Sequence, residues 1–176
     1  MTTAIVLVLL VVVAAVVAAT VVVRNGKREY ARANEVVPGT ATRAPAEWAG
    51  AHTPEARLHR RLRDVVEALR ANPAMEDAWM LEARVSLEQH ALAVDDRLIA
   101  VAALPERVRT EPLAGVAAAV DAVELALASM ISAGPETERR TGLDRAMTDV
   151  ETRVALLAEG LAEEPAGGPA GGLAED

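Results

Sequence analysis

The stretch LAGVAAAVDAVELALASM, from Leu113 to Met130, places apolar side chains at alternating spacings of three and four residues. These side chains are Leu113, Val116, Val120, Val123, Leu127 and Met130. Such spacings return to the same face of an α-helix, which has about 3.6 residues per turn. The pattern therefore predicts a core helix, from about Glu111 to Ala133.

The next segment repeats this pattern and predicts a partner for that helix. Gly134 and Pro135 separate the two, and the second helix is expected from about Glu136 to Glu163. Its apolar seam consists of Leu143, Met147, Val150, Val154, Leu157 and Leu161. Because the connection is so short, we expect the two helices to pack as an antiparallel pair.

Two more helices are predicted upstream. Thr53, Pro54 and Glu55 form a helix start, with a hydroxyl cap, a proline in the first turn and an acid near the positive end of the helix dipole. The stripe of this first, shorter helix is Leu58, Leu62, Val65, Val66 and Leu69. A longer helix, from about Ala74 to Leu104, carries Leu87, Ala91, Val94, Leu98 and Val101. Residues 53–163 should thus form an all-α antiparallel bundle of three long helices plus the shorter first one.

Composition agrees with a helical core. The chain has no Phe, two Trp and one Tyr, so packing falls to Leu, Val, Ile, Met and Ala, which favours helix over sheet. The absence of cysteine excludes a disulfide framework, a thiolate metal site and a thiol nucleophile.

A long apolar run predicts a membrane anchor. After a short tail of residues 1–3, residues 4–23 contain no charge, and a helix of that length spans about 30 Å, one bilayer core. A cleaved signal peptide is the alternative, but the run is too long for one and has no Ala-x-Ala cleavage site. Ala14 with Ala18, and Ala15 with Ala19, leave a homo-oligomer open as a further alternative.

Charges beside this run predict its orientation. Arg24, Lys27, Arg28 and Arg32 follow the run, and no Lys or Arg precedes it. Basic flanks stay on the cytoplasmic side. We therefore expect a single-pass protein of the cell membrane whose C-terminal domain is cytoplasmic.

Residues 24–52 and 164–176 are expected to lie outside the bundle. The former should be a basic juxtamembrane segment and a linker, because Asn34–His52 carries two prolines and two glycines without apolar periodicity. Such a linker would hold the bundle off the membrane and leave Trp48 exposed, unless it folds back. The latter segment, which is rich in Gly and Pro and acidic at its end, is expected to be disordered.

No catalytic, cofactor-binding or metal-binding residue can be assigned. His52, His59 and His90 lack the Glu-x-x-His spacing of metal sites in bundles, so solvated surface positions are expected. The single lysine, Lys27, follows no glycine-rich phosphate-binding loop. We therefore expect neither an enzyme nor a cofactor.

Two carboxylates fall on the apolar stripe of the predicted helix from about Ala74 to Leu104. Glu88 and Asp95 are seven residues apart, and two buried carboxylates would be costly and thus suggestive of function. The sequence favours the edge of the face instead, near Arg84 and Arg97, with both groups reaching water.

Charge is distributed unevenly and suggests where partners bind. The chain carries a net charge of −8, but residues 24–70 have ten basic and six acidic side chains. The candidate membrane-surface or partner-binding residues are Arg24, Lys27, Arg28, Arg32, Arg57, Arg60, Arg61 and Arg63. The expected function is a membrane-anchored interaction or scaffold module for a protein partner. The alternative is a binder of anionic lipid or nucleic acid through the arginines of the first helix. Nucleic acid is the less favoured ligand, because the distal part is acidic and aromatics are scarce.

Overall fold

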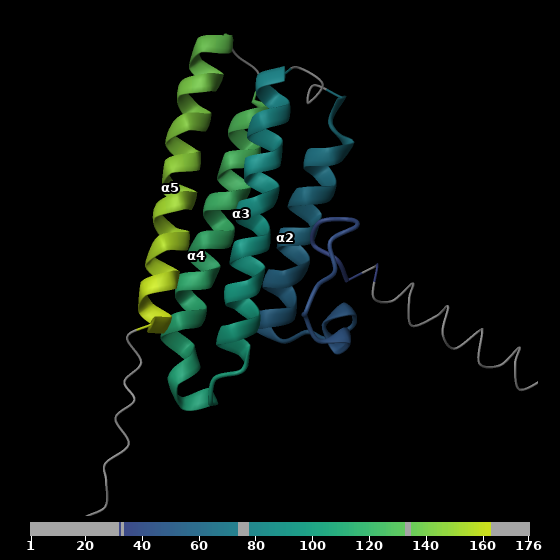
Figure 1. Cartoon of the computed structure of the whole chain (residues 1–176), viewed down its shortest axis with the longest axis vertical. Helices are drawn as coiled ribbons and strands as arrows, with labels where there is room; N and C mark the ends of the chain where they lie inside the picture. The colour runs from purple at the N-terminus through teal and green to yellow at the C-terminus, as the bar shows by residue number, and fades with distance from the viewer. Residues whose placement is uncertain (1–31, 33, 74–77, 133–134, 163–176) are drawn as a thin grey trace, which may run out of the picture.

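The computed structural model describes Arg32 and residues 34–73, 78–132 and 135–162 (Figure 1). A short 3₁₀ helix, η1 (Ala46–Ala49), precedes four α-helices. These are α2 (Pro54–Ala71), α3 (Ala78–Ala102), α4 (Glu106–Ile131) and α5 (Glu136–Ala162). No strand occurs in these ranges, which confirms the all-α prediction.

The four helices stand side by side and alternate in direction along the bundle (Figure 1). The central pair, α3 and α4, packs together, and each of the two also contacts both α2 and α5. As a result α2 and α5 lie on opposite sides of the molecule.

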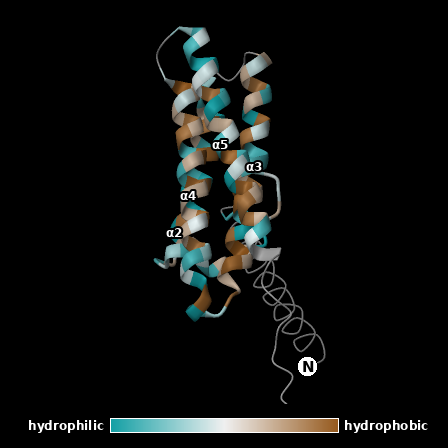
Figure 2. Cartoon of the chain, turned by 90° about the vertical axis from the view of Figure 1, so that its left-hand side faces the viewer, coloured by the Kyte–Doolittle hydropathy of each residue, from teal (hydrophilic) through white to brown (hydrophobic). Residues whose placement is uncertain are grey.

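The predicted apolar seams form the core. Val116, Val120 and Val123 of α4 are each 0% exposed. In α5, Val150 is also fully buried, whereas Val154 and Leu157 are only partly buried. Apolar and polar bands alternate along the helices in Figure 2, as expected when one side of each helix packs and the other faces water.

The start of α4 differs from the prediction. The helix begins at Glu106 rather than near Glu111, and Pro112 lies inside it. Pro112 has no N–H for the bond to the carbonyl four residues earlier, which normally disfavours helix. The first turn is fixed by Arg109, whose Nε and Nη2 donate to Leu104 O at 3.1 and 2.6 Å. Arg109 Nη1 also donates to Glu55 Oε1 on α2 at 3.1 Å.

Residues 34–52, here called the N-terminal extension, do not stand clear of the bundle as the linker interpretation expected. Val36, Val37 and Trp48 are 1%, 5% and 7% exposed and belong to the same core as the helices. The segment has no periodicity because it packs as irregular backbone with a single 3₁₀ turn. Its few apolar side chains nevertheless hold it against the bundle. Because Trp48 is one of them, the expectation of an exposed Trp48 is wrong.

One helix of the described chain, α4, is long and apolar enough to cross a membrane by length and composition alone. It packs against α2, α3 and α5, as a core helix does. The predicted span at residues 4–23 and the predicted disordered tail at 164–176 lie outside the described residues. The fold by itself gives the N-terminal span no support.

Candidate functional site

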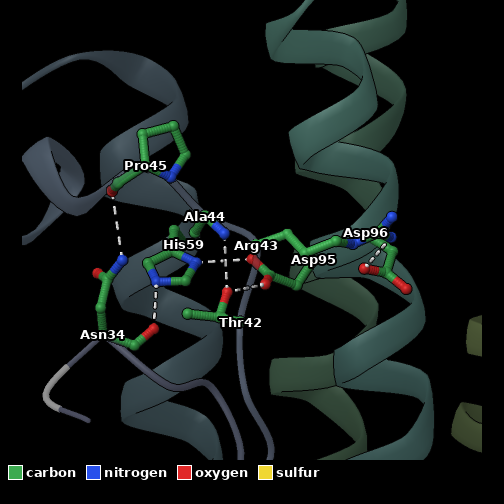
Figure 3. A network of polar contacts seen from close by, with 8 residues as sticks. All are labelled: Asn34, Thr42, Arg43, Ala44, Pro45, His59, Asp95 and Asp96. Atoms are coloured by element: carbon green, nitrogen blue, oxygen red, sulfur yellow. Dashed lines mark hydrogen bonds and ion pairs between the residues drawn. The ribbon is translucent and has the colours of Figure 1, made fainter. Parts of the chain in front are cut away.

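A buried histidine and aspartate meet where α2, α3 and the N-terminal extension come together (Figure 3). His59 Nδ1 of α2 lies 2.6 Å from Asp95 Oδ1 of α3, and the two side chains are 0% and 4% exposed. The other ring nitrogen, Nε2, lies 2.9 Å from the main-chain carbonyl oxygen of Asn34. His59 therefore connects the extension to α3 through its two nitrogens.

The partners of His59 restrict where its hydrogens lie. A carbonyl oxygen only accepts, so Nε2 must carry a hydrogen and donate it to Asn34 O. One more hydrogen must lie between Nδ1 and the Asp95 carboxyl, on either atom. In both arrangements the pair as a whole is neutral, which is the condition under which two such groups are tolerated in a core.

Further polar contacts from the extension complete this site, which we call the His59–Asp95 network. Thr42 Oγ1 donates to Asp95 Oδ2 at 3.3 Å and accepts from the N–H of Ala44 at 3.0 Å. Asn34 Nδ2 donates to Pro45 O at 3.3 Å. The Trp48 ring meets the His59 ring edge to face, with centroids 5.5 Å apart.

An exposed ion pair lies beside the network. Arg43 Nη2 donates to Asp96 Oδ1 at 2.8 Å (Figure 3). The hydrogen bond and the charge of Asp96 raise the pKa of Arg43 above its usual value. Since both side chains are more than half exposed, the pair adds little stability and serves to hold the outer edge of the extension.

Helical spacing explains why these two polar groups are buried. His59 comes three residues before Leu62 and seven before Val66, so it shares the buried face of α2. Asp95 comes four residues after Ala91 and three before Leu98 on α3. The surface assignment is therefore wrong for His59, although His52 is exposed as expected. These spacings were a usable signal for His59.

Glu88 is also buried, at 9% exposure, rather than at a wet edge as predicted. Arg70 of α2 grips it with two hydrogen bonds, Nε to Oε1 at 2.8 Å and Nη2 to Oε2 at 2.9 Å. The predicted neighbour Arg84 lies 3.6 Å away. These hydrogen bonds raise the pKa of Arg70 above its usual value. Because Arg70 belongs to α2 and Glu88 to α3, the pair forms a second polar contact between the two helices.

Burial and hydrogen bonding limit the chemistry that the His59–Asp95 network can perform. Both ring nitrogens are bonded and the ring is 0% exposed, so neither nitrogen can exchange a proton with a molecule outside in this conformation. What the network does is join three segments that lie far apart in the sequence. It holds the N-terminal extension against α2 and α3.

The structure separates the candidate arginines of α2 rather than bringing them together. Arg60 Nη1 donates to the carbonyls of Trp48 and Ala51 at 3.0 and 2.7 Å, and so closes η1 against α2. Arg61 forms two hydrogen bonds to Glu124 of α4 and one to Asp121, at 2.6 to 2.7 Å. These bonds, those to Glu124 foremost, raise the pKa of Arg61 well above its usual value. Both cations are thus committed to contacts within the fold.

The other candidate cations have different surroundings. Arg32 and Arg63 line a shallow cavity of about 440 Å³ together with Arg70, Glu35 and Glu67. Arg63 also lies 3.8 Å from Asp64. Arg57 is exposed on α2, and the candidates Arg24, Lys27 and Arg28 lie outside the described residues.

Within residues 34–73, 78–132 and 135–162, no group of three or more His, Asp or Glu side chains is placed to hold a metal ion. Comparison of the chain with protein-family models, with curated proteins and with solved structures found no significant match.

Proposed function

We propose that this protein is a membrane-anchored helical module that binds a protein partner at the inner face of the membrane. The observation that supports this proposal is the docking of the N-terminal extension. The Asn34 main chain is bonded to His59, and Val36 and Val37 are buried against the bundle. The bundle therefore begins at Asn34, and not after a free linker that ends at His52.

The segment between the apolar run and Asn34 is short, and this limits how far the bundle can lie from the membrane. Ten residues, 24–33, separate the apolar run from Asn34, and fully extended they reach about 35 Å. If residues 4–23 span the bilayer, the bundle is held near the membrane surface by a short tether attached at one point. A fixed attachment limits the orientations of the bundle and so lowers the entropic cost of meeting a partner in the same membrane.

A second candidate function is contact with anionic lipid, and one observation favours it. Arg32 and Arg63 line the same cavity beside the start of the extension, and Arg32 is close in sequence to the predicted span. Basic groups near an anionic surface contribute about 1 kcal/mol each. The set available for lipid is smaller than the sequence suggested, because Arg60 and Arg61 are bonded inside the fold.

Photo-crosslinking of the full chain in its native membranes tests the proposal. The crosslinking amino acid is placed at exposed positions on three helices: Gln89, Leu125 and Leu156. We expect a discrete protein adduct from at least one position, saturating with expression level. It should weaken but not vanish at about 1 M salt, where charges are screened beyond about 3 Å, because apolar contact does not depend on charge.

Two other outcomes would reject the proposed function. Adducts with lipid alone, lost when Arg32, Arg57 and Arg63 are replaced by Glu, would establish the lipid-binding alternative. No protein adduct from any of the three positions would remove the interaction module.

A further inference from the structure

A shallow groove lies between the first half of α3 and the first half of α5. Its volume is about 370 Å³, and its apolar lining includes Trp79 of α3 with Leu143 and Met147 of α5. Beside it on α3, Leu81 and Val85 are 44% and 45% exposed. They line a second shallow depression that shares two residues of α3 with the groove. The two shared residues, Glu82 and Ser86, are polar and separate this depression from the apolar lining of the groove.

The rim of the groove is negatively charged. Glu82, Asp144 and Glu151 line it, and all three are exposed. None of them forms an ion pair with another side chain of the described ranges. The single cation of the rim, Arg140, is already engaged, because it pairs with Glu136 at 2.6 Å and lies over the Trp79 ring at 4.8 Å. The groove thus presents three uncompensated carboxylates.

The position of the groove suits a protein partner rather than a lipid surface. The N-terminal extension packs against α2, and α5 lies on the opposite side of the bundle (Figure 1). The α5 side of the groove therefore lies across the bundle from α2, which carries Arg63 and Arg70 of the cavity that Arg32 lines. A surface with negative charge would also be repelled by an anionic bilayer.

We propose that the groove between α3 and α5 binds an amphipathic helix of a protein partner, with an apolar stripe flanked by Lys or Arg. This inference rests on the proposed function and names the surface and the chemistry of the partner. A groove with apolar lining between two packed helices is a usual receptor for an amphipathic helix. Asp144 and Glu151 are two helical turns apart, about 10.5 Å, so basic residues at the same interval on the bound helix face both.

Charge complementarity selects this occupant over the others that the chain offers. The C-terminal residues 163–176 carry four acidic side chains and no basic one, so they are repelled from the rim. A second copy would bring a bundle that is itself acidic overall, since residues 34–162 carry 14 basic and 21 acidic side chains. A basic helix neutralises the rim while covering Trp79 and Met147.

The test uses the full chain in discs of zwitterionic lipid and a labelled synthetic helix with a Leu stripe and Lys flanks as the probe. Binding is followed by fluorescence polarisation. The triple variant Glu82→Lys, Asp144→Lys and Glu151→Lys should lower the affinity at least tenfold. A matched variant, Glu47→Lys, Glu111→Lys and Glu159→Lys, changes the net charge by the same amount at exposed sites away from the groove. It should bind within twofold of the parent.

Several results would overturn the inference. These are equal loss of affinity in both variants, equal binding of the probe to empty discs, and binding of a Leu and Glu helix as tight as that of the Lys helix. A dimeric parent that the groove variant makes monomeric would assign the groove to a second copy instead.

The crosslinking experiment distinguishes a wrong docking site from a wrong function. If the groove variant still gives the partner adduct from Leu125 or Leu156 in native membranes, the interaction module stands and the groove is not its docking site. If the parent gives no adduct there, the function itself fails, whatever the synthetic helix does.

Discussion

The Nδ1 atom of His59 lies 2.6 Å from the Oδ1 atom of Asp95, and this contact joins α2 to α3 in a part of the core that water does not reach. Removing one member leaves the other buried without its partner. We therefore expect Asp95→Ala to lower the free energy of unfolding by about 3 kcal/mol or more. Urea unfolding of residues 34–162, followed by circular dichroism, measures this effect.

The double variant His59→Leu and Asp95→Leu is the control for that result. It removes both polar groups together, so its cost should be well below the sum of the costs of His59→Leu and Asp95→Leu made separately. Strictly additive costs would mean that the two side chains do not interact, and would contradict the geometry.

The N-terminal extension should stabilise the bundle measurably. A fragment that starts at residue 46 lacks the Asn34 carbonyl that accepts from His59, as well as buried Val36 and Val37. Two such side chains are worth about 1.5 to 3 kcal/mol each when fully buried. Residues 34–162 should therefore melt at a higher temperature than residues 46–162. Equal melting temperatures would show that the extension is not part of the stable fold.

Much of the fold could be predicted from the sequence, because apolar spacing is a local property. This spacing predicts the seam from Leu113 to Met130. The start at Thr53 is predicted from another local signal, its capping residues, and Thr53 Oγ1 does accept from the N–H of Ala56. The placement of the extension could not be predicted. It depends on a few apolar side chains in irregular backbone, which leave no period to detect.

The polar contacts at the candidate site were harder to predict than the helices. Spacing alone can place His59 on the buried face, but its partner Asp95 is 36 residues away on another helix. Likewise, the arginines of α2 formed one cluster in the sequence, whereas the helix points Arg61 at α4 and Arg60 at η1. Which charges stay free depends on the neighbouring helices, and these are known only once the fold is.

Two valines of the apolar seams should respond differently to the same change. Val120 is 0% exposed in α4, whereas Val154 of α5 is only partly buried. Val120→Asp buries an unpaired charge and should cost about 3 kcal/mol or more. Val154→Asp should cost clearly less, since its carboxylate can reach water. Thermal melts of residues 34–162 decide this, and an equal loss for both variants would contradict the burial difference.

The pair of Glu55 with Arg109 should make stability depend on acid pH. Burial raises the pKa of Glu55, but hydrogen bonds from its own N–H, Thr53 and Arg109, with the positive charge of Arg109, lower it by more. The folded pKa thus lies below the ordinary value of 4.5, so the carboxylate stabilises the fold above that value. This stabilisation is lost as the pH falls through the folded pKa. Glu55→Gln should flatten the acid limb of the stability profile, whereas Glu111→Gln, at an exposed site, should leave it unchanged.

Orientation in the membrane can be tested through the flanking charges. A reporter fused after Asp176 that is active only in the cytoplasm should be active, because Arg24, Lys27 and Arg28 follow the apolar run and no basic residue precedes it. A variant with Thr2→Lys and Thr3→Lys, and with the three flanking cations replaced by Gln, moves the positive charge to the other end of the apolar run. It should lower the activity of the cytoplasmic reporter and raise that of a reporter that is active only outside the cell. An externally active reporter on the unchanged chain would overturn the orientation. A mature N-terminus beyond Thr20 would instead mean that the run is a cleaved signal, and the bundle would then lack its anchor.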